Sequence, residues 1–139
     1  MTVYIMRLLR LAQETARAHL ALAERSADRA GLTPAESRLL AALKDGATVS
    51  QLARRLGLTR QSVQRVADRL SEKKLARFTS NPDHQRSPLL TPTESGIRAR
   101  ERAMRELGDW EARLRDLVEP EELETAELAL EALLSALES

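Results

Sequence analysis

The stretch "TVSQLARRLGLTRQSVQRVADRL", Thr48–Leu70, decides the fold of this 139-residue chain. It contains two short runs of apolar residues at helical spacing, with Gly57 at the junction between them. A threonine precedes each run and is a favoured residue before a helix, while glycine permits a sharp turn after one. The stretch therefore predicts two helices, over about 49–56 and 60–73, that meet at a tight corner.

The second of these helices has two different sides. Its apolar side is expected to dock on the preceding helices, whereas its outer side carries long hydrogen-bonding side chains. Arginine pairs with guanine edges and glutamine with adenine edges in the DNA major groove, and serine contacts a base or a phosphate. The predicted base-reading residues are Arg60, Gln61, Ser62, Gln64 and Arg65.

Charge is distributed unevenly along the chain. Residues 44–105 contain 14 Lys/Arg and 6 Asp/Glu, a net charge of +8, whereas residues 106–139 contain 2 and 11, a net charge of −9. A basic middle indicates an anionic partner, although a merely solvated helix surface is the alternative. The basic residues predicted to contact phosphates are Arg54, Arg55, Arg69, Lys73 and Arg77.

A long helix is predicted before the corner, over residues 3–30. Its apolar positions are Val3, Met6, Leu9, Ala12, Ala16, Leu20, Ala23 and Ala27. A stripe of this length in so small a chain favours burial against a second subunit, with an intrachain core helix as the alternative. A second helix is expected to begin at "TPAE", where Thr33 and Glu36 form a capping box.

After the corner, residues 75–92 predict a β-hairpin, because "NPDHQRS" is turn chemistry between two strand-like segments. Pro88 and Pro92 predict an edge role for its returning strand. Thr93 is expected to cap a helix reaching about Val118, with Ile97, Met104, Leu107, Leu114 and Leu117 as its apolar positions. A last helix, about 121–138, is predicted to turn Leu123, Ala126, Leu130, Leu133, Leu134 and Leu137 inward.

A helix, a tight turn and a second helix with a polar outer face form a helix-turn-helix, and the adjoining hairpin makes it a winged helix. The predicted fold is mainly α, with a two-stranded wing and with long helices at both ends, for which the resemblance described next implies a role in dimerisation. The wing-tip residues His84, Gln85 and Arg86 are predicted to reach the neighbouring minor groove, where arginine is favoured.

The segments "LTPAESRLLAAL", "VADRLSEKKL" and "NPDHQRSPLLTPTESG" resemble the MarR family of bacterial transcriptional regulators. The resemblance covers essentially the whole chain. It implies one domain, 1–139, in which residues 33–96 bind DNA and residues 1–32 and 97–139 interlock two subunits. It also implies a palindromic operator and a small phenolic or other lipophilic effector that weakens DNA binding, by changing the spacing of the two recognition helices.

The chain departs from the family pattern at three places. Lys74 stands where the family usually has glycine, so it must adopt a left-handed conformation or end the helix differently. The wing has His84-Gln85-Arg86 where Asp-Arg-Arg is common, so one positive charge is lost. Pro92 replaces a usual leucine. With no cysteine in the chain, thiol oxidation is excluded as its signal.

The remaining composition favours no other class of protein. His19 and His84 lack partners at metal-ligand spacing, no cofactor motif is present, and no catalytic set appears. Tyr4 and Trp110 are interpreted as packing residues, with an effector pocket as the alternative, and Arg17, Arg38 and His19 are possible partners of an anionic effector. The apolar runs are too short for a membrane span and the N-terminus does not resemble a signal peptide, which favours a cytoplasmic location.

The resulting prediction is a non-enzymatic, sequence-specific DNA-binding regulator, a homodimeric repressor that responds to a small molecule. Two alternatives remain open at this point. One is a DNA-binding protein of the same fold that does not respond to a ligand. The other is a winged-helix module that binds protein, against which the basic middle and the polar helix face both argue.

Overall fold

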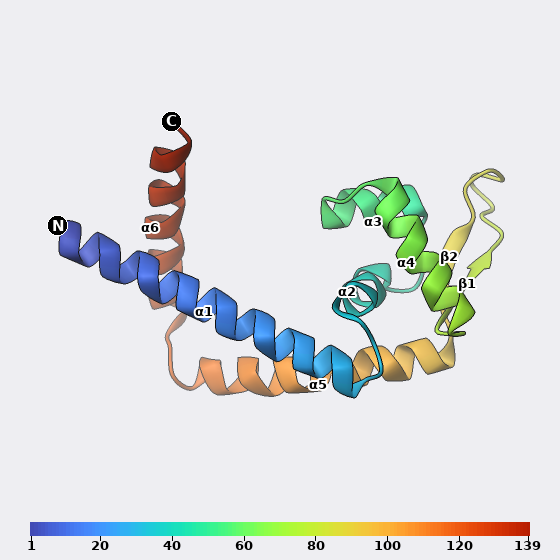
Figure 1. Ribbon diagram of the computed structural model, residues 1–139, viewed down its shortest axis with the longest axis horizontal. Helices are drawn as coiled ribbons and strands as arrows, with labels where there is room; N and C mark the ends of the chain where they lie inside the picture. Colours follow the sequence, from blue (N-terminus) through green and yellow to red (C-terminus); the bar gives the residue numbers. More distant parts are fainter. The chain divides into compact units, whose positions relative to one another are not determined.

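The computed structural model describes residues 1–139 and is mainly helical (Figure 1). The chain separates into two compact units, residues 1–107 and 108–139, with the division inside a helix. Unit 1 contains α1 (Thr2–Arg29), α2 (Pro34–Leu43), α3 (Val49–Leu56), α4 (Arg60–Glu72), β1 (Ala76–Thr79), β2 (Leu89–Pro92) and the first part of α5 (Glu94–Arg115). Unit 2 contains the rest of α5 and α6 (Pro120–Glu138).

This order of elements confirms the predicted winged helix-turn-helix. The predicted helix limits are accurate to within one or two residues except at the end of α5, which stops at Arg115 rather than near Val118. The backbone amides of Leu117 and Val118 both donate to the Leu114 carbonyl, so the chain turns there instead of continuing the helix.

The core of unit 1 lies where α2, α3 and α4 meet the hairpin, and Figure 1 shows these helices together with the wing beside α4. The apolar spacing of each helix turns one side toward this centre. The large apolar side chains that are fully buried are Leu39, Leu40, Leu43, Leu52, Val63, Leu70 and Leu90. The core therefore fixes how the outer side of α4 is presented to solvent.

Local capping sets the start of each helix around the corner. Thr33 with Glu36, and Thr48 with Gln51, form the reciprocal hydrogen bonds of a capping box. Thr59 accepts a hydrogen bond from the Ser62 amide, 3.1 Å away. At the end of α3, Gly57 adopts a left-handed conformation with φ +63°, as the tight corner requires.

The wing is an antiparallel pair in which Phe78 faces Leu90 and Thr79 faces Leu89. β2 is an edge strand of this two-stranded sheet, as predicted, but it makes one isolated bridge on its other side, at Leu90. The Leu90 amide and carbonyl pair with Ala47 on the other side, at 2.8 and 3.0 Å. Pro88 and Pro92 each lie two residues from Leu90, so the amide of Leu90 itself is present to donate to Ala47.

The predicted apolar positions of the long helices need correction. In α5 the buried residues are Gly96, Ala99 and Ala103, so small side chains rather than Ile97 or Met104 make its internal contact. The prediction that α6 turns its leucines inward is wrong within the chain, because α6 has no buried residue. In α1 only Ser26 and Ala27 are buried. The large apolar side chains left exposed include Val3, Met6, Leu20, Met104, Leu117, Leu123, Leu134 and Leu137.

Lys74 ends α4 in the left-handed conformation, with φ +58°. Its amide donates to the Ser71 carbonyl, and the amide of Leu75 donates to the Leu70 carbonyl. A helix end with these bonds usually has glycine at the left-handed position. We expect Lys74→Gly to raise the free energy of unfolding by about 0.5–1 kcal/mol, because glycine adopts this conformation without a steric cost. The measurement is urea denaturation. Glu72→Gly is the control: inside the last turn of α4, glycine should lower stability by about 1 kcal/mol.

Candidate nucleic-acid interface

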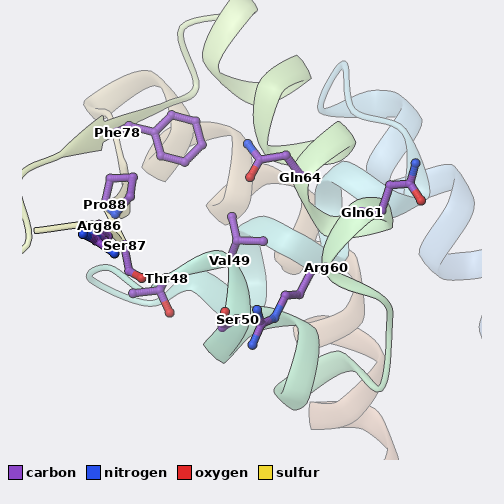
Figure 2. A pocket seen from close by; sticks show the side chains of 10 residues that line it. All are labelled: Thr48, Val49, Ser50, Arg60, Gln61, Gln64, Phe78, Arg86, Ser87 and Pro88. Atoms are coloured by element: carbon purple, nitrogen blue, oxygen red, sulfur yellow. The ribbon is translucent and has the colours of Figure 1, made fainter. Parts of the chain in front are cut away.

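A groove of about 540 Å³ lies between the start of α3, the start of α4 and the wing. Figure 2 shows residues of α3 and α4 on one side of this groove and wing residues on the other. Its lining residues are Thr48, Val49, Ser50, Arg60, Gln61, Gln64, Phe78, Arg86, Ser87 and Pro88. The groove therefore brings together predicted residues from the second helix of the corner and from the wing tip, which are distant in sequence.

The outer face of α4 carries four of the five predicted base-reading side chains. Arg60, Gln61, Gln64 and Arg65 are all exposed. The Gln64 side-chain amide donates to Asp68, 2.9 Å away, so its position on the helix surface is fixed. These side chains are long and lie on one exposed helical face. They can therefore form hydrogen bonds with groups on the surface of a partner that lies against α4.

Ser62 differs from the other predicted base readers. It is half-buried, and its hydroxyl accepts a hydrogen bond of 2.8 Å from the Thr59 hydroxyl. Its amide also donates to Thr59, so the residue belongs to the cap of α4. Base contact by Ser62 stays a prediction, and it would have to be made by a side chain already engaged in the cap.

The predicted phosphate-contacting residues fall into two groups. Arg54 is exposed and lines a smaller hollow of about 370 Å³ beside the wing, and Arg77 is exposed on β1. The other three have partners within the chain. Arg55 donates to the Ala42 carbonyl at the end of α2, 2.9 Å away. Arg69 and Lys73 face the carboxylate of Glu36.

The wing tip has its own local order. The Asn81 side chain accepts from the Asp83 amide and donates to the Ser87 carbonyl, at 3.1 and 2.9 Å. These bonds close the turn that the sequence predicts. They leave His84, Gln85 and Arg86 exposed, with Arg86 at the large groove and His84 at the smaller hollow.

Sequence reasoning missed several residues around this surface. Phe78, Thr48 and Ser50 line the groove, but their role depends on how the wing folds back toward α3, which no local pattern shows. Arg100 of α5 was also missed: its guanidinium donates to the carbonyls of Leu40 and Lys44, at 3.3 and 3.0 Å. This cation satisfies carbonyls at the end of α2.

The structure presents no cluster of three or more His, Cys, Asp or Glu side chains placed to hold a metal ion. None of the helices combines the length and the apolar character that a membrane span requires. What the surface does offer is a convex helix with arginine and glutamine side chains, flanked by a basic wing. That combination suits a polyanion that also presents hydrogen-bond donors and acceptors, as the base edges of DNA do.

The chain was compared with family models, with curated proteins and with solved structures. The MarR family matches residues 30–87 of the chain. The protein named uncharacterized protein Rv2011c, from Mycobacterium tuberculosis, is 43% identical over 114 residues, which cover 81% of this chain and 80% of that protein. At this identity and coverage the two chains share a family.

Solved structures match in fold. The structure of the MarR family transcription regulator SP03579 has a TM-score of 0.82 at 24% identity, covering 98% of this chain and 93% of that one. Escherichia coli MarR C80S, in complex with operator DNA, has a TM-score of 0.72 at 23% identity, covering 94% and 96%. CouR from Rhodococcus jostii RHA1, bound to p-coumaroyl-CoA, has a TM-score of 0.73 at 20% identity, covering 88% of each chain.

Proposed function

The chain belongs to the MarR family of transcription regulators, and from this premise we propose that it is a sequence-specific DNA-binding repressor that acts as a homodimer. The observation that carries the proposal is the exposed face of α4, where Arg60, Gln61, Gln64 and Arg65 lie together beside the wing. A helix of this kind fits the major groove of B-DNA, where arginine and glutamine discriminate base pairs.

Phosphate contacts supply the rest of the proposed affinity. Arg54 is exposed on α3, Arg77 is exposed on β1, and Arg86 is exposed in the turn between the two strands of the wing. Contacts with phosphates orient the protein and make its affinity depend on salt, but they carry no sequence information. In this arrangement α4 reads bases, the basic residues fix its register, and Arg86 enters the adjacent minor groove.

The proposal of a homodimer is supported by the exposed apolar residues at the two ends of the chain. In the proposed arrangement residues 1–32 and 97–139 pair two subunits, and residues 33–96 bind DNA. Two copies related by a two-fold axis would present two α4 helices to successive major grooves, about 10 base pairs apart. The operator is accordingly proposed to be palindromic, and the protein to act in the cytoplasm.

We further propose that a small phenolic or lipophilic molecule weakens DNA binding. CouR, of the same fold, is bound to p-coumaroyl-CoA in its structure. Such a ligand would act by altering the separation of the two α4 helices, and it must bind the DNA-incompetent form more tightly. Titration of phenolic acids into the DNA complex tests this. Unchanged operator affinity at saturating concentrations of all of them favours a ligand-independent regulator.

DNA binding itself is tested by fluorescence anisotropy with the DNA upstream of the protein's own gene and with a scrambled duplex, each at two salt concentrations. We expect a preference for the upstream DNA that persists at the higher salt concentration, because base contacts are less sensitive to salt than phosphate contacts. Equal and steeply salt-dependent binding to both duplexes would reject base readout. Absence of binding to either duplex at low salt would favour the protein-binding alternative.

The assignment of α4 is tested by substitution. Gln61→Ala and Arg65→Ala should each weaken binding to the upstream DNA by about 10- to 100-fold while changing binding to the scrambled duplex much less, since a base contact contributes about 1–3 kcal/mol of discrimination. Arg98→Ala is the matched control, because Arg98 is exposed on α5 and bonds only to Ser95 on its own helix. An equal loss in Arg65→Ala and Arg98→Ala would show that Arg65 acts through its charge and not through a base contact. Gln61→Ala removes no charge, so an unchanged affinity in that variant would reject base contact by Gln61.

A further inference from the structure

Glu36 is the most buried charged residue of the chain, with 1% of its surface exposed. It lies in the first turn of α2, where one carboxylate oxygen accepts from the Thr33 amide at 3.1 Å. The same oxygen lies 2.8 Å from Nζ of Lys73, and the other lies 3.9 Å from Nε of Arg69. Both cations come from the C-terminal end of α4, which lies more than thirty residues further along the chain.

A carboxylate removed from water at this position needs positive charge and hydrogen bonds around it. The capping box satisfies only part of that need. Lys73 and Arg69 supply the rest, and Lys73 also donates to the Gly31 carbonyl, 3.5 Å away, in the turn between α1 and α2. The end of α4 is therefore bonded directionally to the start of α2 and to the turn that precedes it.

The apolar contacts of α4 do not supply this kind of constraint. Val63, Ala67 and Leu70 bury the inner side of the helix, but apolar contact is not directional and allows small rotations and slides. Reading base edges requires the helix angle to be correct, because hydrogen bonds weaken steeply when misaligned. A directional ion pair at the far end of α4 limits those motions.

We propose that Glu36 is a positioning residue for DNA recognition, and that Lys73 and Arg69 affect DNA affinity by fixing α4 through Glu36 rather than by contacting phosphates. The inference rests on the proposed function, since it assumes that α4 reads DNA. For Lys73 and Arg69, this positioning role replaces the phosphate contacts that the sequence predicts. Their side chains are 43% and 50% exposed, respectively, so solvent reaches them while their charged groups face Glu36.

The sign of the effect of Glu36→Gln separates the proposal from a purely electrostatic role. Removing a negative charge should by itself raise the affinity for DNA. If Glu36 positions α4, the same change should instead lower affinity for the upstream DNA by about tenfold, a typical size for a coupled position remote from the ligand. Glutamine keeps the carbonyl that accepts from Thr33, so the start of α2 is preserved. Higher or unchanged affinity in a folded variant would overturn the proposal.

A double-mutant cycle with Lys73→Met gives a second, independent test. If Lys73 acts through Glu36, Lys73→Met lowers affinity in the native background, has little effect in the Glu36→Gln background, and leaves the salt dependence of binding unchanged. A phosphate contact would instead cost the same in both backgrounds and reduce the slope of log K against log salt by about one. Arg77→Met is the control, for which the reduced slope is expected in both backgrounds.

A third measurement does not depend on DNA binding. Hydrogen exchange of the free protein should show faster exchange over residues 66–73 in Glu36→Gln than in the native chain, with other core helices unchanged. Native protein that binds neither duplex would reject the proposed function, yet the exchange result would still decide whether Glu36 fixes α4. Unchanged exchange over residues 66–73 would show that it does not. Should Lys73→Met alone fail to fold, the double variant, which has no unpaired buried carboxylate, replaces it.

Discussion

Gly96→Ala should lower the free energy of unfolding by more than about 3 kcal/mol, an unusually large effect for the addition of one methyl group. Gly96 lies in the first turn of α5 and is buried. A Cβ built on it would overlap the Leu75 carbonyl oxygen and lie 2.9 Å from the carbonyl carbon. Those atoms are backbone, so the methyl group is accommodated only if α5 moves away from the segment before β1.

Movement of α5 there would break a network of short contacts. The Thr93 hydroxyl donates to the Lys74 carbonyl at 2.7 Å and accepts from the Gly96 amide at 3.1 Å, while the Thr93 amide donates to Leu75 at 3.1 Å. These bonds join the end of α4, the wing and the start of α5. Gly96→Ala should therefore also weaken DNA binding in whatever fraction of the protein remains folded.

Gly108→Ala is the matched control within the same helix. Apart from the adjoining residues and the backbone of its own helix, a Cβ at Gly108 would meet no atom within 4 Å, so alanine adds no clash. Because alanine favours helix over glycine, stability should rise by up to about 1 kcal/mol. Thermal and urea denaturation of both variants measure the difference. Loss of less than about 1 kcal/mol in Gly96→Ala would show that α5 and the Leu75 backbone are not packed as closely as described.

These two glycines also show what sequence patterns predict and what they do not. The helix-turn-helix was predictable, because caps and the turn depend on residues within a few positions of one another: Thr48 with Gln51, Thr59 with Ser62, and Gly57 at the corner. Gly96 and Gly108 look alike in sequence, since both interrupt a helical pattern. Only the position of Leu75, twenty-one residues before Gly96, makes one of them necessary.

The same limit applies to the candidate interface. The exposed face of α4 follows from helical spacing, so Gln61, Gln64 and Arg65 could be placed from sequence. Basic residues cannot be sorted in that way, because a cation that bonds to its own chain has the same sequence signature as one that contacts phosphate. Arg55 bonds to a carbonyl of α2 and Lys73 to the buried Glu36, and both partners lie on another helix.

The prediction of which residues are buried in the long helices was wrong for a related reason. Helical spacing identifies an apolar side but not its partner, so the leucines of α6 were predicted to be inward although the chain offers no element that buries them. In α5 the prediction followed the large apolar residues and left out Ala99 and Ala103, whose small side chains are the ones that are buried and allow close packing. In the proposed homodimer a second copy of the chain buries the large exposed residues, and the last prediction starts from that proposal.

Leu134→Glu should raise the dissociation constant of the proposed homodimer by about 100-fold or more. Leu134 is 57% exposed and lies on the same side of α6 as Leu130 and Leu137. Burial of a leucine contributes about 1.5–3 kcal/mol, and a two-fold interface loses that contribution twice. The measurement is sedimentation equilibrium over a range of concentrations, followed by binding to the upstream DNA, which should weaken because one subunit reaches only half of a palindrome.

Leu128→Glu is the control, since Leu128 is 68% exposed and lies on a different side of α6 from the stripe that contains Leu134. Both substitutions add one negative charge to an already acidic helix, so general repulsion would affect them equally. A loss confined to Leu134→Glu would identify the stripe as the surface between subunits. Equal dissociation constants in the two variants would contradict that placement, and a native protein that is monomeric at micromolar concentrations would contradict the proposed dimer itself.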